Sequence, residues 1–299
     1  LHLLSRRQRQ MCIRDRTKVI VCSNSGIDYV QHPYDIEVFR SIVQYSETEK
    51  YDDYTEISAE TFYNRLITDK EAFPHTAYVT PGHMIEVFEQ AKKDGYDSAL
   101  VLVIAKPLSG LHNAVELYAK EVENFKVTVY DSHCLAYPEA LMAIEAARMF
   151  QEDKTLEEVI QRLDFIRDNN HMIFAVDTLE YLIKNGRLSR VAGMFANMLS
   201  IRPILDLDSE GKVRTLEKVR TAKAARKRLI QMYLEEIAGK EVIPFILHAN
   251  ADKEILAELR RGVSEARPEF TEIPDYLLTP VVGSHTGPGT VCLGYILKQ

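Results

Sequence analysis

Short apolar stretches alternate with segments of helical period through the first half of this chain. The stretches TKVIVC (17–22), SALVLVI (98–104) and KVTVY (126–130) are rich in β-branched residues, as is typical of strands covered on both faces. One apolar helical face lies in each intervening segment, made by Met84, Val87, Phe88 and Ala91 and then by Leu111, Ala114, Val115, Tyr118, Ala119 and Val122. Further helices are predicted over 138–150 and from the capping box TLEE (155–158). The alternation predicts an α/β fold whose N-terminal domain, 17–166, has three layers and a mostly parallel sheet.

The pattern changes after about residue 167. HMIFAV (171–176), RPILDL (202–207), VIPFILH (242–248) and TVCLGYIL (290–297) indicate strands, and helices are expected over 221–238 and 252–266. LDLDSEGKVRTLEKVR has alternating residues on both sides of a turn at 209–211, which predicts a β-hairpin. We therefore expect a C-terminal α+β domain, 167–299, with a mixed sheet. The more polar stretch 29–74 predicts only a strand, a loop and a short helix from near Ser58.

The first 16 residues, LHLLSRRQRQMCIRDR, differ from the rest. They carry five arginines and one aspartate, a composition shared with transit peptides. Because no apolar face leads into the first strand, a non-native or disordered extension is the preferred interpretation. Without its charge of +4, the net charge of −7 becomes −11. So acidic a body argues against nucleic acid as a partner.

Several classes of protein are excluded or disfavoured by what the sequence lacks. No stretch approaches 18 consecutive apolar residues, so no segment is expected to span a membrane. The four cysteines, Cys12, Cys22, Cys134 and Cys292, form neither a CxxC pair nor a metal-type cluster, which favours a reduced, cytoplasmic protein without a metal. Neither a P-loop nor a GxGxxG pattern occurs, which disfavours a nucleotide-binding enzyme.

Polar groups follow the predicted strands of the first half. SNSG comes after Cys22, AKPLSG after Ile104 and DSH after Tyr130, while HTAYVTPG precedes the helix near 82–93. Since ligands bind at the carboxyl ends of parallel strands, we expect hydroxyls and free amides to collect at one edge of the sheet. Ser109 and Thr80 are each equally explained as simple helix caps.

Two motifs in the second half carry further candidate groups. YLLTPVV reads as a strand that enters the turn GSHTGPG (283–289), where glycine and proline can direct successive amides toward an anion; the alternative is a tight connection with a surface histidine. Arg187 follows the helix-ending pair Asn185–Gly186 and either bonds nearby carbonyls or pairs with an acid such as Asp177. An amphipathic segment comes next and offers Val191, Met194, Phe195, Met198 and Leu199 to the core or to a ligand pocket.

Four long segments together resemble the DegV family of bacterial fatty-acid-binding proteins: DGYDSALVLVIAKPLSGLHNAV, VYDSHCLAYPEALMAIEAARM, VDTLEYLIKNGRLSRVAGMFANMLSIRPIL and VVGSHTGPGTVCLGYI. The similarity extends over about residues 17–299. It implies that a long-chain fatty acid lies between the two domains, with its carboxylate held by polar side chains from both.

The resemblance also implies the site residues. TAYVT takes the place of the family's TSQPS segment, which makes Thr76 a carboxylate-binding hydroxyl and puts Thr80 at the later serine. Ser109 and Gly110 match the LSG motif, Arg187 matches the GGR segment, and His285 and Thr286 match the GTHTGPG segment. Three departures affect the pocket rim and the preferred chain: Cys22-Ser23-Asn24 replaces a TDS-like triplet, Tyr78-Val79 replaces Gln-Pro, and HCLAYPEA follows the DS pair in place of a glycine-rich stretch.

The function implied by the resemblance is that of a non-catalytic carrier. It would withdraw a fatty acid during transient membrane contact and present the carboxylate to an ATP-dependent fatty acid kinase, whose acyl phosphate feeds phospholipid synthesis. No cofactor is implied apart from the bound fatty acid. Two alternatives remain open: an acyl hydrolase or acyl-transfer enzyme using Ser109, His285 and either Asp177 or Asp131, and a binding module for another amphipathic acid.

Overall fold

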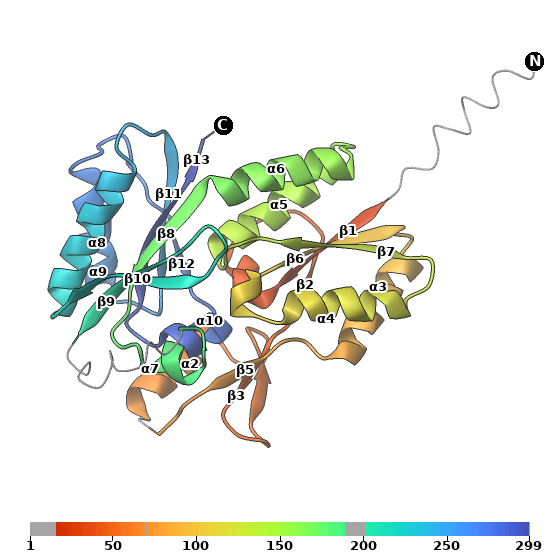
Figure 1. The fold of residues 1–299 in the computed structure, drawn as a ribbon, viewed down its shortest axis with the longest axis horizontal. Coiled ribbons are helices and arrows are strands. Elements are labelled where there is room, and N and C mark those ends of the chain that lie inside the picture. Colours follow the sequence, from red (N-terminus) through yellow and green to blue (C-terminus); the bar gives the residue numbers. More distant parts are fainter. Residues whose placement is uncertain (1–15, 70, 189–200, 299) are drawn as a thin grey trace, which may run out of the picture.

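The computed structural model describes residues 16–69, 71–188 and 201–298 (Figure 1). Of the predicted extension 1–16, all but its last residue lies outside these ranges. The apolar residues of the predicted amphipathic segment, 191–199, lie outside them as well.

The first sheet is parallel throughout. Its strands are β1 (Thr17–Cys22), β2 (Ile36–Phe39), β6 (Ser98–Val103) and β7 (Lys126–Asp131), in the order β2-β1-β6-β7. The predicted strands at 17–22, 98–104 and 126–130 are therefore confirmed. Because all four strands run the same way, the segments that follow them emerge at one edge of the sheet.

Helices cover both faces of this sheet (Figure 1). Ile20 and Cys22 of β1 belong to the apolar cluster formed with α3 (Pro81–Lys93) and α4 (Leu111–Tyr118). Val19 and Val21 belong to the cluster on the other face, with α5 (Tyr137–Gln151) and α6 (Leu156–Asp168). Alternate residues of one strand are thus buried on opposite sides, which accounts for its continuous apolar run. The predicted three layers and the capping box at Thr155 are confirmed.

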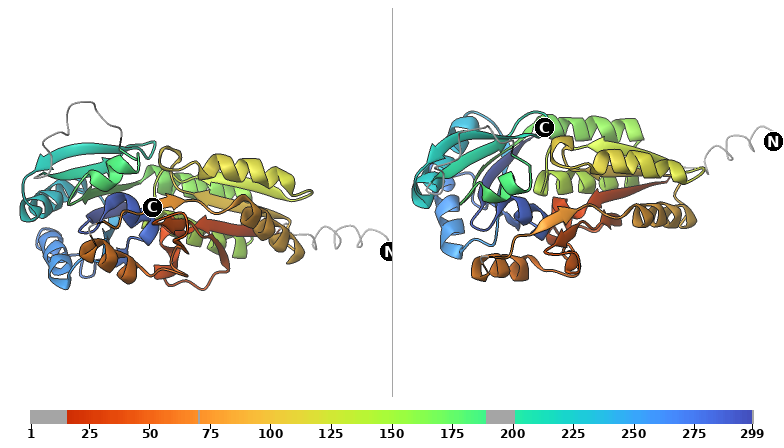
Figure 2. Two further views of the ribbon diagram at one scale, coloured as in Figure 1. Left: turned by 90° about the horizontal axis from the view of Figure 1, so that it is seen from below. Right: turned by 60° about the horizontal axis from the view of Figure 1, so that its bottom comes forward.

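The second sheet is mixed, as predicted. It contains β8 (Asn170–Ala175), β9 (Arg202–Leu207), β10 (Val213–Val219), β11 (Val242–His248), β12 (Asp275–Leu277) and β13 (Val291–Leu297), in the order β10-β9-β8-β13-β11-β12. The β9–β10 hairpin is antiparallel, whereas β11 and β12 are parallel. Helices α8 (Ala222–Glu236) and α9 (Lys253–Ser264) pack on one face, at the end of the molecule farthest from the parallel sheet (Figure 2).

One apolar cluster joins the two sheets. It contains Val19 and Val21 of the first sheet together with Phe245 and Leu247 of the second. The ring of Tyr137 at the start of α5 stacks on that of Tyr276 in β12, with centroids 4.1 Å apart. The division of the chain at 166/167 stays a prediction, because the buried side chains are continuous across it.

Two predictions about local structure are wrong. The described part of 29–74 contains not one strand but β2, β3 (Ile42–Gln44) and β4 (Lys50–Asp52), and β3 pairs with both β4 and β5 (His75–Ala77). These strands have only three or four residues each, too few to give a clear alternation in a polar segment. The predicted helix near Ser58 is confirmed as α2 (Ala59–Thr68), and Ser58 is its N-cap.

The second error concerns the apolar run YLLTPVV, which is not a strand into the turn. β12 ends at Leu277, and Val281 and Val282 lie in the short helix α10 (Pro280–Thr286). Thr279 accepts a hydrogen bond from the Val282 amide, and Pro280 occupies the first helical position. A hydroxyl cap followed by proline is a helix-start signal that outweighs the apolar run.

A charged cluster surrounds the buried Asp206 of β9, with His171 of β8 and Glu236 of α8 partly exposed. His171 contacts Glu236 through Nδ1 at 2.6 Å and Asp206 through Nε2 at 3.2 Å, and Asp206 also binds Arg214. Burial opposes the protonated form, but the two carboxylates outweigh it and raise the pKa of His171 to about 9. The cluster therefore carries a protonated imidazole at neutral pH.

Candidate functional site

A cavity of about 440 Å³ lies where the two sheets meet. Its wall includes Cys22 at the carboxyl end of β1, Phe174 of β8, Leu207 of β9 and Val213 of β10. All six site residues predicted from the sequence line it: Thr76, Ser109, Gly110, Arg187, His285 and Thr286. Ser109 and Gly110 follow β6 at the carboxyl edge of the parallel sheet, as expected, whereas Thr76 lies in β5 of a separate three-stranded sheet.

The rest of the lining is largely apolar and was not predicted. It contains Ile104, Leu108, Leu111, Leu135, Phe174, Leu182, Leu207, Val213, Val281 and Val282. These residues come from both halves of the chain and share no local motif. Only the folded arrangement brings them together.

Thr76 and His285 form the centre of the polar part. Their side chains are hydrogen-bonded, with Thr76 Oγ1 and His285 Nε2 at 2.8 Å. Thr76 lies in β5, whose partner strand β3 packs with β5 against α10, the helix that carries His285. The histidine predicted at the mouth of the cavity is therefore held on a short helix and not on a turn.

His285 is neutral in this environment. Burial, reinforced by the positive charge of Arg187 and by His75, lowers the pKa of His285 to about 3. Its Nδ1 atom is buried without a hydrogen-bond partner among the described residues. A buried N–H without an acceptor costs more than a buried lone pair, which favours the Nε2–H tautomer. Nε2 then donates to Thr76, and the threonine hydroxyl proton is available to a ligand.

Arg187 is the cation of the site. Its guanidinium donates to the backbone carbonyls of Leu108 at 3.0 Å and Asn185 at 2.5 Å. Among the residues that the structure describes, no carboxylate pairs with it; Asp177, one of the alternatives considered, pairs with Arg202. Burial lowers the pKa of Arg187, and no counter-ion among the described residues offsets it. The two carbonyls thus hold the cation in place, with no described carboxylate paired to it.

Asn185 fixes this arrangement and was recognised in the sequence only as a helix end. It follows α7 (Glu180–Lys184) and donates to the carbonyls of Pro74 at 3.2 Å and Ser284 at 2.8 Å, while its Oδ1 contacts His75 Nδ1 at 2.9 Å. The Asn185 side chain therefore links its own segment, which continues into Gly186 and Arg187, to the segment before Thr76 and to the helix that carries His285. No periodic pattern marks such a side chain.

Ser109 and Thr80 differ in their placement. Ser109 lines the cavity, and its Oγ accepts from the Leu111 amide at 3.2 Å just before α4, whose N-cap is Gly110, so the hydroxyl keeps its own proton for a ligand. Gly110 approaches Tyr78, whose ring would lie 3.7 Å from an added Cβ, and Tyr78 is 40% exposed at the rim. Thr80 is the N-cap of α3 and is not among the residues that line the cavity, so Thr80 is a helix cap and not a ligand-binding hydroxyl.

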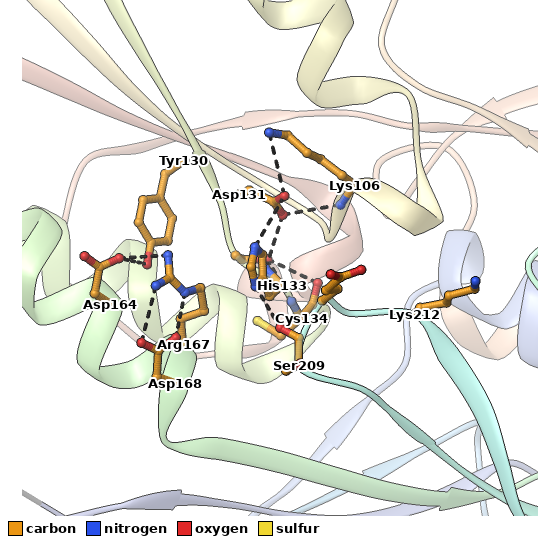
Figure 3. A network of polar contacts seen from close by, with 12 residues as sticks. Lys106, Tyr130, Asp131, His133, Cys134, Asp164, Arg167, Asp168, Ser209 and Lys212 are labelled. Atoms are coloured by element: carbon orange, nitrogen blue, oxygen red, sulfur yellow. Dashed lines mark hydrogen bonds and ion pairs between the residues drawn. The ribbon is translucent and has the colours of Figure 1, made fainter.

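The tip of the β9–β10 hairpin lies against the segment that follows β7 (Figure 3). His133 Nδ1 contacts the Ser209 carbonyl at 2.9 Å, and the His133 amide donates to Asp131 at 3.3 Å. Within the tip, Asp208 accepts hydrogen bonds from the amides of Glu210 and Lys212, which fixes the turn.

Gly211 makes this contact sterically possible. Its φ of +80° suits glycine, and an added Cβ would lie 2.2 Å from Ala105 Cβ and 2.7 Å from the His133 carbonyl oxygen. Leu207 and Val213 on the two sides of the tip line the cavity. The hairpin contact therefore positions part of the apolar wall.

The arrangement does not supply a Ser-His catalytic pair. Between Ser109 and His285, both within the described ranges, no hydrogen bond is present, because His285 Nε2 is engaged by Thr76. No described acid orients the Nδ1 atom. Nor do the described residues bring together three His, Cys, Asp or Glu side chains that could hold a metal ion.

The fold and the cavity define a class of α/β proteins in which a parallel and a mixed sheet enclose one amphipathic site. The chain belongs to the DegV family: the family model described as "Uncharacterised protein, DegV family" matches residues 16–298. A DegV domain-containing protein of Clostridium acetobutylicum is 29% identical over 92% of this chain and 96% of its own length.

Two solved structures extend the comparison. A DegV family protein of Thermus thermophilus, described by its fatty acid binding, superposes with a TM-score of 0.82 and 26% identity over 95% of this chain and all of that one. A hypothetical protein of Thermotoga maritima, described as revealing a fatty acid binding function, has a TM-score of 0.77 and 27% identity over the same shares. The similarity thus covers both sheets and the cavity between them.

Proposed function

We propose that this protein binds a long-chain fatty acid in the cavity as a non-catalytic carrier. The carboxylate is held by Thr76, Ser109 and Arg187, with His285 positioning the Thr76 hydroxyl and Gly110 and Thr286 completing the surrounding wall. The observation that carries the proposal is that Arg187, which no described carboxylate pairs with, lines the same mainly apolar cavity as the hydroxyls of Thr76 and Ser109.

The polar groups meet the requirements of a buried carboxylate. Such an anion is tolerated only if charge-assisted hydrogen bonds replace its hydration. Thr76 offers its hydroxyl proton when His285 Nε2–H donates to it, and Ser109 retains its own. Arg187 supplies the charge. Neutral His285 acts through Thr76 and not as a cation.

The apolar lining accounts for affinity. Burying about fourteen methylene groups contributes on the order of 11 kcal/mol, against about 4 to 15 kcal/mol for association. A cavity of about 440 Å³ falls within the usual range for small-molecule sites. The tail therefore provides most of the binding energy, and the head group sets orientation and selectivity.

The destination of the fatty acid follows from the family resemblance. We infer that the loaded protein presents the carboxylate to an ATP-dependent fatty acid kinase, and that the acyl phosphate enters phospholipid synthesis. The alternative of a Ser109/His285 acyl hydrolase receives no support from the geometry, since that pair is not hydrogen-bonded.

Solvent extraction of the purified protein followed by mass spectrometry tests the proposal. An equimolar long-chain acid supports it. A protein that contains no lipid, takes up no added fatty acid and turns over esters in a manner abolished by Ser109→Ala would establish the hydrolase instead.

Paired variants locate the head group. Thr76→Val and Arg187→Ala are expected to weaken fatty acid binding by at least about tenfold, because each removes a donor to a charged group. Thr80→Val is the control, since this second threonine of TAYVT caps α3 outside the cavity. Equal affinities for the Thr76 and Thr80 variants would show that the carboxylate lies elsewhere.

A further inference from the structure

A second buried polar pair lies at the cavity, apart from the groups assigned above. Asn24 follows β1 in the short 3₁₀ helix η1 (Ser23–Ser25), is 2% exposed and lines the cavity. Its amide contacts Glu139 of α5, which is fully buried, at 2.6 Å. In this orientation Asn24 Nδ2 donates to the carboxylate, and both Asn24 Oδ1 and Glu139 Oε1 are buried with no hydrogen-bond partner among the described residues.

The pair lies close to the proposed head-group site. η1 packs against α10, which carries His285. Ser23 Oγ accepts from the Ser41 amide at 3.2 Å, and Ser41 directly precedes β3, the strand that pairs with Thr76. Asn24 therefore lines the cavity from an element that adjoins those carrying His285 and Thr76.

The charge state of Glu139 decides which way the amide points. No described cation contacts this carboxyl group, and the other ionisable groups facing it are the Asp131 carboxylate and the thiols of Cys22 and Cys134. Its position in the first turn of α5 favours an anion by only about 0.3 to 1 kcal/mol, whereas burying an unpaired charge costs several. Burial, with the Asp131 charge acting in the same direction, raises the pKa of Glu139 well above its usual value.

A protonated carboxyl group needs an acceptor, and an amide can be turned over without changing its shape. The Glu139 hydroxyl then donates to Asn24 Oδ1, so the oxygen that was unpartnered is satisfied. The Asn24 NH₂ group then takes the place of the unpartnered oxygen in this cavity-lining residue and is available as a donor.

We propose that Asn24 is an additional donor to the anionic head group and that Glu139, in its protonated form, is the positioning residue that turns the Asn24 amide toward the ligand. The inference rests on the proposed function, because it takes the ligand to be a carboxylate. It extends that function by assigning selectivity for a carboxylate over a neutral alcohol of the same chain length. In the opposite orientation, Asn24 would offer an acceptor and favour the alcohol.

Binding of decanoate and decanol to the full chain tests the orientation. Asn24→Leu is expected to weaken decanoate binding by about tenfold or more and to leave decanol binding nearly unchanged. If Asn24→Leu does not fold, Asn24→Ser carries the same comparison. Loss of decanol affinity with decanoate unaffected, or equal changes for both, would overturn the proposal.

Infrared spectroscopy tests the protonation directly. The carbonyl band of a protonated carboxyl group is expected in the wild-type protein at neutral pH and absent from Glu139→Gln, which keeps a donor for Asn24 and is expected to bind decanoate within about twofold of wild type. Absence of that band from the difference spectrum would refute the assignment of Glu139. If the wild-type protein binds neither decanoate nor longer acids, the proposed function itself fails, which is a distinguishable result.

Discussion

Substituting Gly211 by alanine measures how strongly the hairpin tip is bound to the parallel sheet. Alanine at φ +80° costs about 1 to 2 kcal/mol from backbone strain. The new Cβ would also lie 2.2 Å from Ala105 Cβ and 2.7 Å from the His133 carbonyl oxygen. Either the hairpin tip moves away or the side chains there are overpacked, which costs about 1 to 3 kcal/mol in addition. We expect Gly211→Ala to lower the free energy of unfolding by about 2 to 5 kcal/mol.

Gly239 provides the control. Its φ is +71°, yet no atom lies within 4 Å of an added Cβ, so Gly239→Ala carries the strain without the collision. The free energies of unfolding of the two variants in urea should differ by at least about 1 kcal/mol, and this difference measures the cost of the steric contact at Gly211. Fatty acid retention should fall only for Gly211→Ala, because Leu207 and Val213 line the cavity on either side of that tip. Equal destabilisation of the two variants, with equal retention, would refute the reasoning.

Three further measurements follow from buried groups. The pKa of His171 is raised from 6.5 to about 9, so its contribution to the free energy of unfolding is complete below pH 6.5 and is lost as the pH rises toward 9. In urea unfolding, the wild type should therefore lose up to about 3 kcal/mol more stability than His171→Gln across that pH range. Parallel stability curves for the two proteins would contradict this. Burial raises the pKa of Cys22 to about 12 and also raises the pKa of the Cys134 and Cys292 thiols, so peptide mapping after iodoacetamide treatment should find all three unmodified until denaturant is added. Tyr63→Phe leaves the Leu278 carbonyl without its 2.9 Å donor and should cost about 1 to 3 kcal/mol in thermal or urea unfolding, and an unchanged stability would show that this bond is dispensable.

The sheets could be predicted because burial on both faces leaves a direct trace in the sequence. β1 and β6 are apolar almost throughout, β7 contributes Val127, Val129 and Tyr130, and the helices between these strands have one apolar face. The strands of the polar stretch 29–74 could not be predicted, because β3 and β4 have three residues each and β3 also pairs with β5, which is distant in sequence. α10 was missed because an apolar run was given more weight than the Thr-Pro start signal within it.

The candidate site was predictable to the extent that it lies in motifs. Thr76, Ser109, Gly110, Arg187, His285 and Thr286 were named from the sequence, and the structure places all of them at one cavity. Residues that act by position alone were not found. Asn185 joins three segments through one amide, and Glu139 meets Asn24 across 115 positions of the chain, so no local pattern indicates either role.

The apolar cluster shared by the two sheets has a consequence for folding. Side chains from β1 through β13 are buried against one another, and Tyr137 stacks on Tyr276 where the halves meet. A polypeptide that ends near residue 166 would expose much of this shared apolar surface to water, and a polypeptide that begins there would do the same. The two halves should consequently melt together in a single step, and neither should persist as an independent globule when produced without the other.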